Sequence, residues 1–402
     1  MFGDPLLVGG IGLEEVLIVL FKTVVTFGVM LGAVILMIWF ERKLIADLQN
    51  RVGPNLAGPF GILQTLADGI KLIFKQDLIP SKADRIIFAV APFLAMVPAF
   101  LSFSIVPLGG DFQDKGGVVS WFGRDTYFQL ADPQVGFLLL LAMSSIGVYG
   151  MMLAGWSSGS KYPLISGVRA TAQAISYEAA LGLSLVSVLI VSGSLSTHDI
   201  VASQAGEGWL GIVPSWNLVV TGVVPFVIFL IAATAELART PFDLVEAEQE
   251  LTGGYNTEYS SIRFGHFYLA EYMNLITMSS IMVTLFLGGP AGPIFGPSFL
   301  HPVLPTVWFV LKVLVFLFAA VWTRATLPRF RYDQLMDLGW KVLIPLSLGW
   351  LLLLATIQVG RDQDWNLAIV ILISLGVLFL GTALLTTAIS TARRARVSEE
   401  VS

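Results

Sequence analysis

The sequence predicts an all-α fold: a polytopic integral membrane helix bundle with one amphipathic interfacial helix. Apolar residues make up 55% of its 402 residues and charged residues only 13%, about half the charged share of a soluble domain. Windows of about 20 apolar residues, the length that crosses a hydrocarbon core of about 30 Å, recur along the chain. There are nine of them, near residues 15–39, 86–107, 133–156, 168–192, 216–238, 264–287, 303–323, 340–359 and 366–390. We therefore expect a single membrane domain over residues 1–402.

Lys and Arg are distributed unevenly between these windows. Most of the 23 basic residues fall in the stretches 40–85, 157–170, 239–263 and 324–341 and in the tail after residue 390. Because cytoplasmic loops collect Lys and Arg, these stretches are predicted to be the inner loops. The odd number of spans then puts the N-terminus outside and the C-terminus in the cytoplasm.

The first window ends in a charged segment, ERKLIADLQNRVGPN, at residues 41–55. Its functional candidates are Glu41, Arg42, Lys43, Gln49 and Arg51. A positive-inside cluster explains the bases. It does not explain Gly53 and Pro54, which together fix a turn before the next helix.

That next helix is predicted over about residues 58–75. Asp68 and Lys71 share a polar stripe at helical spacing, and the other side of the segment is apolar. Such a pattern favours an amphipathic helix lying in the inner membrane interface. A plain anchor, or a helix docked on the bundle, is the alternative interpretation.

Two carboxylates fall inside later windows. Glu178 and Glu271 lie about ten and eight residues from the inner ends, roughly 10 to 15 Å deep at the helical rise. A carboxylate at that depth costs about 3 kcal/mol or more unless it is paired, hydrated or protonated. Both are therefore functional candidates. In the structural alternative, Glu178 pairs with Arg169 or with the hydroxyl of Tyr177 and only joins helices.

The inner loop between the fifth and sixth windows is strongly acidic. Its acids are Glu236, Asp243, Glu246, Glu248, Glu250 and Glu258, whereas its bases are only Arg239 and Arg263. Neighbouring carboxylates raise one another's pKa, so some of these groups should share or hold protons near neutral pH. A solvated acidic loop is the ordinary alternative, but the two flanking spans each bring a further acid. We expect a buried network that exchanges protons.

Several other residue types limit the possible functions. There is no cysteine, and the three histidines are isolated from one another, so a metal site, a haem or an iron–sulfur cluster within this chain is not expected. The net charge of −5 gives no basic surface for nucleic acid. Lys22 is expected to snorkel toward the outer interface, and Lys312 is a candidate for a proton relay or an ion pair.

Four sequence blocks carry a resemblance to a known family. The first is ERK at 41–43 followed by RxGPN and the helix GPFGxLQxLADGIK. The others are GWSSGSKYPLISGVRATAQAISYE at 155–178, ELARTPFDLVEAEQELTGGYNTEYSSIRFGHFYLAEY at 236–272 and RATLPRFRYDQLMDLGWK at 324–341. In this order they resemble the quinone-site membrane subunit of proton-pumping NADH:quinone oxidoreductase, respiratory complex I (the bacterial H subunit and the mitochondrial subunit 1). Departures from the family pattern occur at Gly159, Leu237, Ala238 and Val245. The ninth window, near 366–390, exceeds the eight spans of the mitochondrial form.

The resemblance implies a subunit of an oxidoreductase of the translocase class, with no redox centre and no catalytic residue of its own. Quinone would be its substrate, with nothing bound covalently, and flavin and iron–sulfur clusters would be held only by partner subunits. The implied quinone chamber comprises Glu41, Arg42, Lys43, Gln49, Arg51, Asp68 and Lys71. The implied proton pathway comprises Glu178, Glu236, Asp243, Glu246, Glu248, Glu250, Glu258 and Glu271, supported by Arg169, Arg239 and Arg263.

The implied partners are peripheral-arm iron–sulfur and hydrogenase-like subunits at the inner loops, and small membrane subunits and antiporter-like subunits beside the bundle. Quinone and lipid complete the surroundings, in a bacterial inner (plasma) membrane. Two alternatives stay open. One is a stand-alone proton-coupled secondary transporter that uses the same acids, and the other is the related membrane subunit of a membrane-bound hydrogenase.

Overall fold

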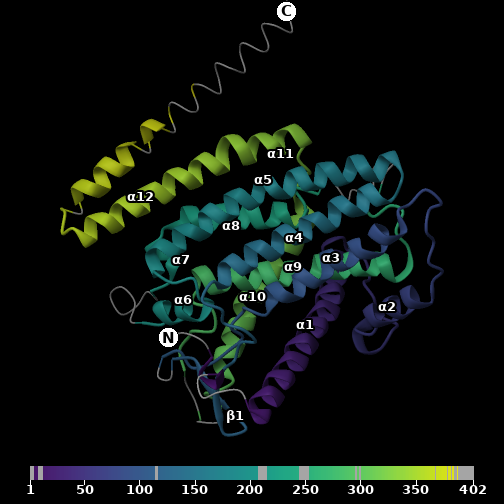
Figure 1. The fold of residues 1–402 in the computed structure, drawn as a ribbon, viewed down its shortest axis with the longest axis horizontal. Coiled ribbons are helices and arrows are strands. Elements are labelled where there is room, and N and C mark those ends of the chain that lie inside the picture. The colour runs from purple at the N-terminus through teal and green to yellow at the C-terminus, as the bar shows by residue number, and fades with distance from the viewer. Residues whose placement is uncertain are drawn as a thin grey trace, which may run out of the picture.

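The chain folds into a helix bundle, shown in Figure 1. The computed structural model describes residues 4–7, 12–113, 116–206, 215–243, 253–294, 297, 300–366, 368–377, 379–381, 383 and 387. Within these residues, seven helices are long and apolar enough to cross a membrane: α1 (Leu13–Leu48), α3 (Arg85–Phe103), α4 (Gly136–Ser157), α5 (Lys161–Ser192), α9 (Ser261–Phe286), α10 (Leu304–Thr326) and the continuous segment Tyr332–Asp362. Two shorter apolar helices are α8 (Val223–Glu236) and Ala368–Gly381. Each of the first eight predicted windows overlaps one of these helices, and the ninth, near 366–390, overlaps Ala368–Gly381 and beyond residue 381 falls mostly outside the described residues. The helices confirm the predicted fold class and an integral membrane protein.

Helix α9 forms the centre of the bundle. In its most apolar stretch 83% of the residues are buried, whereas no other of the seven long helices exceeds 50%. Helices α1, α3 and α10 pack around α9. A polar group on α9 is therefore held away from lipid by the neighbouring helices.

Helices α3, α4 and α5 approach closely through small residues. A Cβ atom on Gly150 of α4 would lie 2.8 Å from the backbone nitrogen of Ala95 on α3. On the other side of α4, a Cβ atom on Gly155 would overlap the carbonyl oxygen of Pro163 on α5. Only glycine fits at such contacts, and close approach of this kind is how helices associate in lipid.

The predicted span near 216–238 is divided into two helices. The first is α7 (Asn217–Val220) and the second is α8, and Gly222 between them has a φ of 82°. Trp350 donates a hydrogen bond of 2.9 Å to the carbonyl oxygen of Thr221. The indole thus pairs a backbone oxygen that the break leaves outside a regular helix.

The remaining long segment contains one irregular turn. It consists of α11 (Tyr332–Leu338), a π-helical turn at Gly339–Leu343, and α12 (Ile344–Asp362). Tyr177 of α5 packs beside Gly339 and donates a hydrogen bond of 2.8 Å to the carbonyl oxygen of Leu335.

The two ends of α1 carry different structures (Figure 1). Near its first residues lies an antiparallel hairpin of β1 (Val118–Trp121) and β2 (Arg124–Tyr127). Arg124 on this hairpin pairs with Glu14 at 3.1 Å. Near the last residues of α1 lies the interfacial helix α2 (Gln64–Phe74). We refer to these ends as the hairpin side and the α2 side.

Helix α2 is docked between α1 and α9, yet it keeps an apolar surface exposed. Trp39 on α1 donates a hydrogen bond of 3.0 Å to the carbonyl oxygen of Phe60. The hydroxyl of Ser261, the first residue of α9, lies 2.9 Å and 2.8 Å from the carbonyl oxygens of Leu72 and Lys75. Because Phe74 remains 85% exposed, the helix has the amphipathic surface that a membrane interface requires.

Candidate functional site

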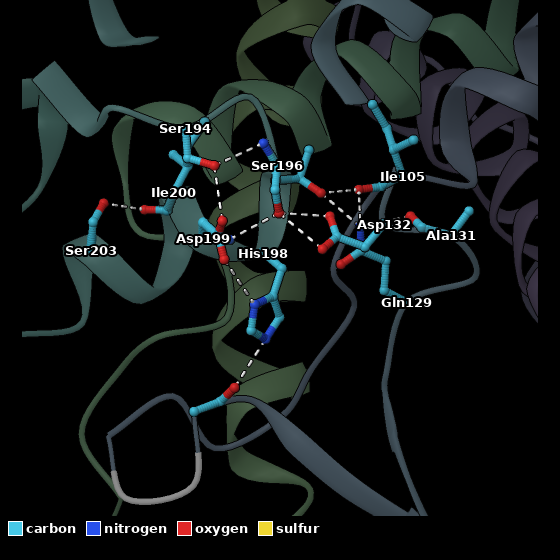
Figure 2. A network of polar contacts seen from close by, with 12 residues as sticks. Ile105, Gln129, Ala131, Asp132, Ser194, Ser196, His198, Asp199, Ile200 and Ser203 are labelled. Atoms are coloured by element: carbon cyan, nitrogen blue, oxygen red, sulfur yellow. Dashed lines mark hydrogen bonds and ion pairs between the residues drawn. The ribbon is translucent and has the colours of Figure 1, made fainter. Parts of the chain in front are cut away.

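Two polar networks lie at the two ends of the bundle, and the network on the hairpin side is made of caps and turns. Figure 2 shows Ser196, the N-cap of α6 (Thr197–Gln204), donating to both carboxylate oxygens of Asp132 at 2.7 and 2.9 Å. His198 Nε2 lies 2.9 Å from the carbonyl oxygen of Gly116. Burial raises the pKa of Asp132, although the bond from Ser196 works against this shift. These contacts hold a loop against a short helix.

Lys22 also belongs to the hairpin side, and its predicted snorkelling is wrong. Its side chain is only 4% exposed, and its Nζ lies 2.8 Å from a carboxylate oxygen of Asp4 and 2.9 Å from the hydroxyl of Thr126. An anion and a hydroxyl within reach make burial of this ammonium group possible. The partners come from distant parts of the chain, so no local pattern indicated them.

The network on the α2 side contains most of the predicted site residues, and Arg42 and Asp68 form its outer part. Arg42 on α1 pairs with Asp68 on α2 at 2.6 Å, and Lys71 lies 3.4 Å from the same carboxylate. Burial by itself would raise the pKa of Asp68, but the hydrogen bond and charge of Arg42, assisted by Lys71, lower it below its ordinary value. An ion pair therefore joins the interfacial helix to the first span.

The turn between α1 and α2 keeps its polar groups at the surface. Lys43 donates a hydrogen bond of 2.6 Å to Asn55, and Arg51 donates one of 2.7 Å to Gln49. Gly61 has a φ of 78°, and a Cβ atom there would overlap the carbonyl oxygen of Pro54. The turn at residues 53–55 and the turn at residues 59–61 thus pack directly on one another. This contact positions α2.

Glu41 directly precedes Arg42 in the chain, but its side chain faces different partners. It belongs to a buried cluster of ion pairs. It contacts Arg239 at 2.9 Å and also accepts a hydrogen bond from Arg324. Arg239 lies 3.0 Å from Glu271, and both Glu41 and Arg239 are only 4% exposed at their side chains. Burial disfavours charge on Arg239, but the carboxylates of Glu271 and Glu41 outweigh it and raise its pKa. Glu41 thus has two basic partners, whereas Glu271 shares its single partner, Arg239, with Glu41 and is the less strongly neutralised of the two acids.

Beside this cluster lies a cavity of about 180 Å³, which we call the arginine cavity. Its charged lining consists of Arg239, Asp243, Glu271, Arg324 and Arg329. Asp243 pairs with Arg329 at 3.1 Å. Because the lining also includes aromatic rings such as Tyr268, the cavity offers both ring surfaces and fixed charges to an aromatic polar head group.

Glu178 and Glu236 form a second pair of acids, held by serine hydroxyls. Ser144 on α4 donates to Glu236 at the end of α8, and Ser145 donates to Glu178 on α5. The two carboxylates are close enough to repel one another when both are ionised. Within the part of the chain that the structure describes, no ion pair joins either acid to a base, in contrast to the cluster around Glu41.

The remaining predicted residues lie around these clusters. Arg169 lies over the ring of Tyr332 at 5.3 Å, and Arg263 pairs with Asp77 at 3.3 Å. Glu258 is half-buried in the turn that precedes α9. Glu246, Glu248 and Glu250 lie outside the described residues.

Four residues in these clusters were not predicted as site residues: Ser144, Ser145, Arg324 and Arg329. Arg324 lies in the last turn of an apolar helix, where a base is already explained by the positive-inside rule. The sequence did not single out the two serines, because their role depends on the acids of other helices to which they donate. Lys312, a predicted relay or ion-pair residue, instead donates to the carbonyl oxygens of Leu287, Gly289 and Ala291 at 2.8 to 2.9 Å.

An apolar groove of about 400 Å³ lies between α1, α9 and α10. Its lining includes Trp39 and Phe40 on α1 and Leu317 on α10. Met37, one helical turn before Glu41 on α1, also lines the groove, so on this helix the groove extends to within one turn of the buried ion pairs. Its nearly wholly apolar lining suits a hydrocarbon chain.

Comparison with known proteins gives consistent matches over most of the chain. The family model described as NADH dehydrogenase matches residues 21–355. The H subunit of the NADH-quinone oxidoreductase of Frankia alni is 52% identical over 364 residues, which cover 90% of this chain and 77% of that protein. Its counterpart in Thermomicrobium roseum is 50% identical over 326 residues, which cover 81% of this chain and 91% of that protein. The counterpart in Streptomyces avermitilis is 45% identical over 368 residues, or 90% and 78% of the two chains.

Proposed function

The chain belongs to the NADH dehydrogenase family, and we propose that it acts as the quinone-site membrane subunit of a proton-translocating NADH:quinone oxidoreductase. Electrons from NADH reach quinone through flavin and iron–sulfur clusters in the peripheral subunits. This chain forms the membrane part of the quinone chamber and the first part of the proton pathway.

One observation carries the proposal: Glu271 borders two cavities. On one side it lines the arginine cavity, and on the other it lines a smaller cavity that also contacts Glu236. A charge that appears in the arginine cavity is therefore close to Glu271, which also lines the smaller cavity beside Glu236. Glu271 is the point at which quinone chemistry and proton movement meet.

The quinone enters beside α2, and its tail lies in the apolar groove between α1, α9 and α10. The residues of the chamber are those predicted from the sequence. They are Arg42, Lys43, Gln49, Arg51, Asp68 and Lys71 at its rim, and Glu41, which pairs with the lining residues Arg239 and Arg324 of the arginine cavity. Arg324 and Arg329 join this set, because they line the arginine cavity together with Arg239. Ion pairs at the rim fix the position of α2, and the apolar groove guides the tail.

Reduction of the quinone head takes up two electrons and two protons. Charge created at the head changes the proton affinity of nearby carboxylates, because an added negative charge disfavours ionisation of an adjacent acid. Glu271 responds first, and Glu236 and Glu178 follow, with the loop acids Asp243, Glu246, Glu248, Glu250 and Glu258 as the reservoir. Arg169, Arg239 and Arg263 hold the surrounding segments.

The peripheral subunits bind on the α2 side, and small membrane subunits and antiporter-like subunits receive the protons beyond Glu178. The membrane is the inner membrane of a bacterium, with the N-terminus outside and the C-terminus in the cytoplasm. The relatives, at 44–52% identity over most of the chain, favour neither the stand-alone transporter nor the hydrogenase component.

The test is purification of the tagged chain from its own membranes in a mild detergent. We expect co-purification of several subunits, flavin and iron, together with NADH:quinone reductase activity. Glu271→Gln should lower that activity, while Glu14→Gln, at an exposed acid on the hairpin side, should leave it unchanged. Proton-coupled transport by the isolated chain in liposomes, with no associated flavin, would instead favour the transporter.

A further inference from the structure

A small cavity lies between α3, α4, α9 and the end of α8. Its volume is about 80 Å³, several times the roughly 10–15 Å³ that one water molecule needs by this measure. Its polar lining includes Ser144, Glu236, Glu271, Asn274 and Thr277. We call it the carboxylate cavity, because an acid lies at either side of it.

Two buried polar atoms in its lining have no hydrogen-bond partner among the described residues. They are Oε2 of Glu236 and Oγ1 of Thr277. The other carboxylate oxygen of Glu236 is already occupied by Ser144. A buried polar atom without a partner destabilises the fold, so both atoms need a partner that the cavity can hold.

Thr277 differs from the other hydroxyl residues that follow it on α9. Ser279, Ser280 and Thr284 each donate to the carbonyl oxygen four residues earlier, at 2.7 to 2.8 Å. This is the ordinary bond of a buried hydroxyl within a helix. Thr277, only 1% exposed, does not form it. Its hydroxyl remains available to the cavity.

We propose that Thr277 is a positioning residue that holds a water chain between Glu236 and Glu271. The hydroxyl of Thr277 and the side-chain amide of Asn274 bind water molecules, one of which donates to Oε2 of Glu236. Protons then move between the two acids through these waters. The hydroxyls that α3 and α4 add to the lining, Ser102 and Ser144, already donate to Pro98 and Glu236, and the remaining lining residues of these two helices are apolar or glycine. The inference rests on the proposed function, because it assigns the cavity to that proton pathway.

The experiment compares three variants in the complete, purified complex. Thr277→Val removes the hydroxyl at nearly constant volume, and Thr277→Ser keeps it. Thr284→Val is the matched control, since it removes a buried hydroxyl from the same helix away from the cavity. Each complex is examined by a high-resolution density map and by NADH-driven proton uptake into vesicles.

We expect ordered water density between Glu236 and Thr277 in the wild type, Thr277→Ser and Thr284→Val, and its loss in Thr277→Val. Proton uptake in Thr277→Val should fall about three- to tenfold, the factor that corresponds to one hydrogen bond, and Thr277→Ser should restore it. A wild-type cavity without water, or wild-type uptake by an assembled Thr277→Val complex, would overturn the inference.

A fourth variant, Glu271→Gln, measured for proton uptake in the same vesicles, separates the inference from the proposed function. Water in the cavity, together with proton uptake that Glu271→Gln leaves unchanged, refutes the proton pathway but leaves the water site in place. A dry cavity, together with uptake that depends on Glu271, refutes the water chain alone. Equal losses of uptake in Thr277→Val and Thr284→Val indicate damage to α9 and count against a positioning role.

Discussion

Ser144 and Ser145 are adjacent in the chain, yet they donate to carboxylates on two different helices, Glu236 and Glu178. Successive residues of a helix point about 100° apart, so α4 faces α8 with one hydroxyl and α5 with the other. A hydroxyl can bind either the ionised or the protonated acid, whereas an arginine strongly favours the ionised form. The serines therefore leave these two acids free to change protonation.

Glu178→Gln should disrupt proton translocation without affecting the earlier electron transfer. We expect coupled proton uptake to fall by about tenfold or more, since an amide cannot carry the proton. Electron flow from NADH to a hydrophilic acceptor should remain largely intact, because that acceptor does not use the membrane site. Both rates are measured on the same membranes. Unchanged pumping in well-assembled membranes would remove Glu178 from the pathway.

Glu41→Ala should destabilise the assembled complex. Without Glu41, Arg239 and Arg324 lose a shared buried partner, and breaking such a pair costs about 3–5 kcal/mol. The thermal midpoint of the purified complex measures the effect. Glu14→Ala, at a side chain that is 74% exposed, should change stability by less than about 0.5 kcal/mol. Equal midpoints for the two variants would contradict a buried role for Glu41.

Arg42→Ala and Asp68→Asn should each raise the quinone concentration needed for half-maximal activity, because both release α2 from α1. The double variant should be no worse than either single variant, since one pair is lost in all three. Quantification of the other subunits in each membrane distinguishes weaker quinone binding from poor assembly. Additive effects would show that the two residues act separately.

The pH dependence of this contact follows from the lowered pKa of Asp68. An acid with a lowered pKa in the folded protein stabilises the fold above its unfolded value and loses that contribution as the pH falls through the lower, folded value. Docking of α2 should therefore stay constant across the neutral range and weaken only below the ordinary value of 3.8. Protease accessibility of the α1–α2 turn measures it, and a change near neutral pH would contradict the ion pair.

Lys312→Met should lower stability but leave the ratio of protons to electrons unchanged. Its ammonium group closes the end of α9 through three carbonyl oxygens, and a hydrogen bond from a charged group contributes about 1.5–3 kcal/mol. The thermal midpoint and the pumping ratio are measured together. A lower ratio at an unchanged midpoint would restore Lys312 as a relay residue.

The spans were predictable because apolar length depends on composition alone. The amphipathic helix was also predictable, because Asp68, Lys71 and their apolar neighbours follow the helical period. The division at Gly222 was not, since it depends on Trp350, more than a hundred residues away. Elements that depend on local pattern were found, and those that depend on distant partners were not.

The site follows the same rule. Glu178 and Glu271 were found because an acid within an apolar span is costly wherever it lies, and Glu236 was found because it begins the acidic inner loop. The sequence analysis placed Glu41 and Arg42 in one site because they are adjacent in the chain. Adjacent helical residues face different neighbours, so adjacency did not predict their partners. Glu41 turns to Arg239 and Arg324, whereas Arg42 turns to Asp68. Thr277 could not be singled out at all, because what marks it is a bond that it does not make.

The hydroxyl of Ser261 binds the last turn of α2 to the first residue of α9. The same helix carries Glu271 and Thr277, which face the interior. We expect that a displacement of α2 by the surrounding lipid also displaces the first turn of α9. Any movement of α2 at the membrane interface would therefore reach the helix that carries both the acid and the hydroxyl of the carboxylate cavity.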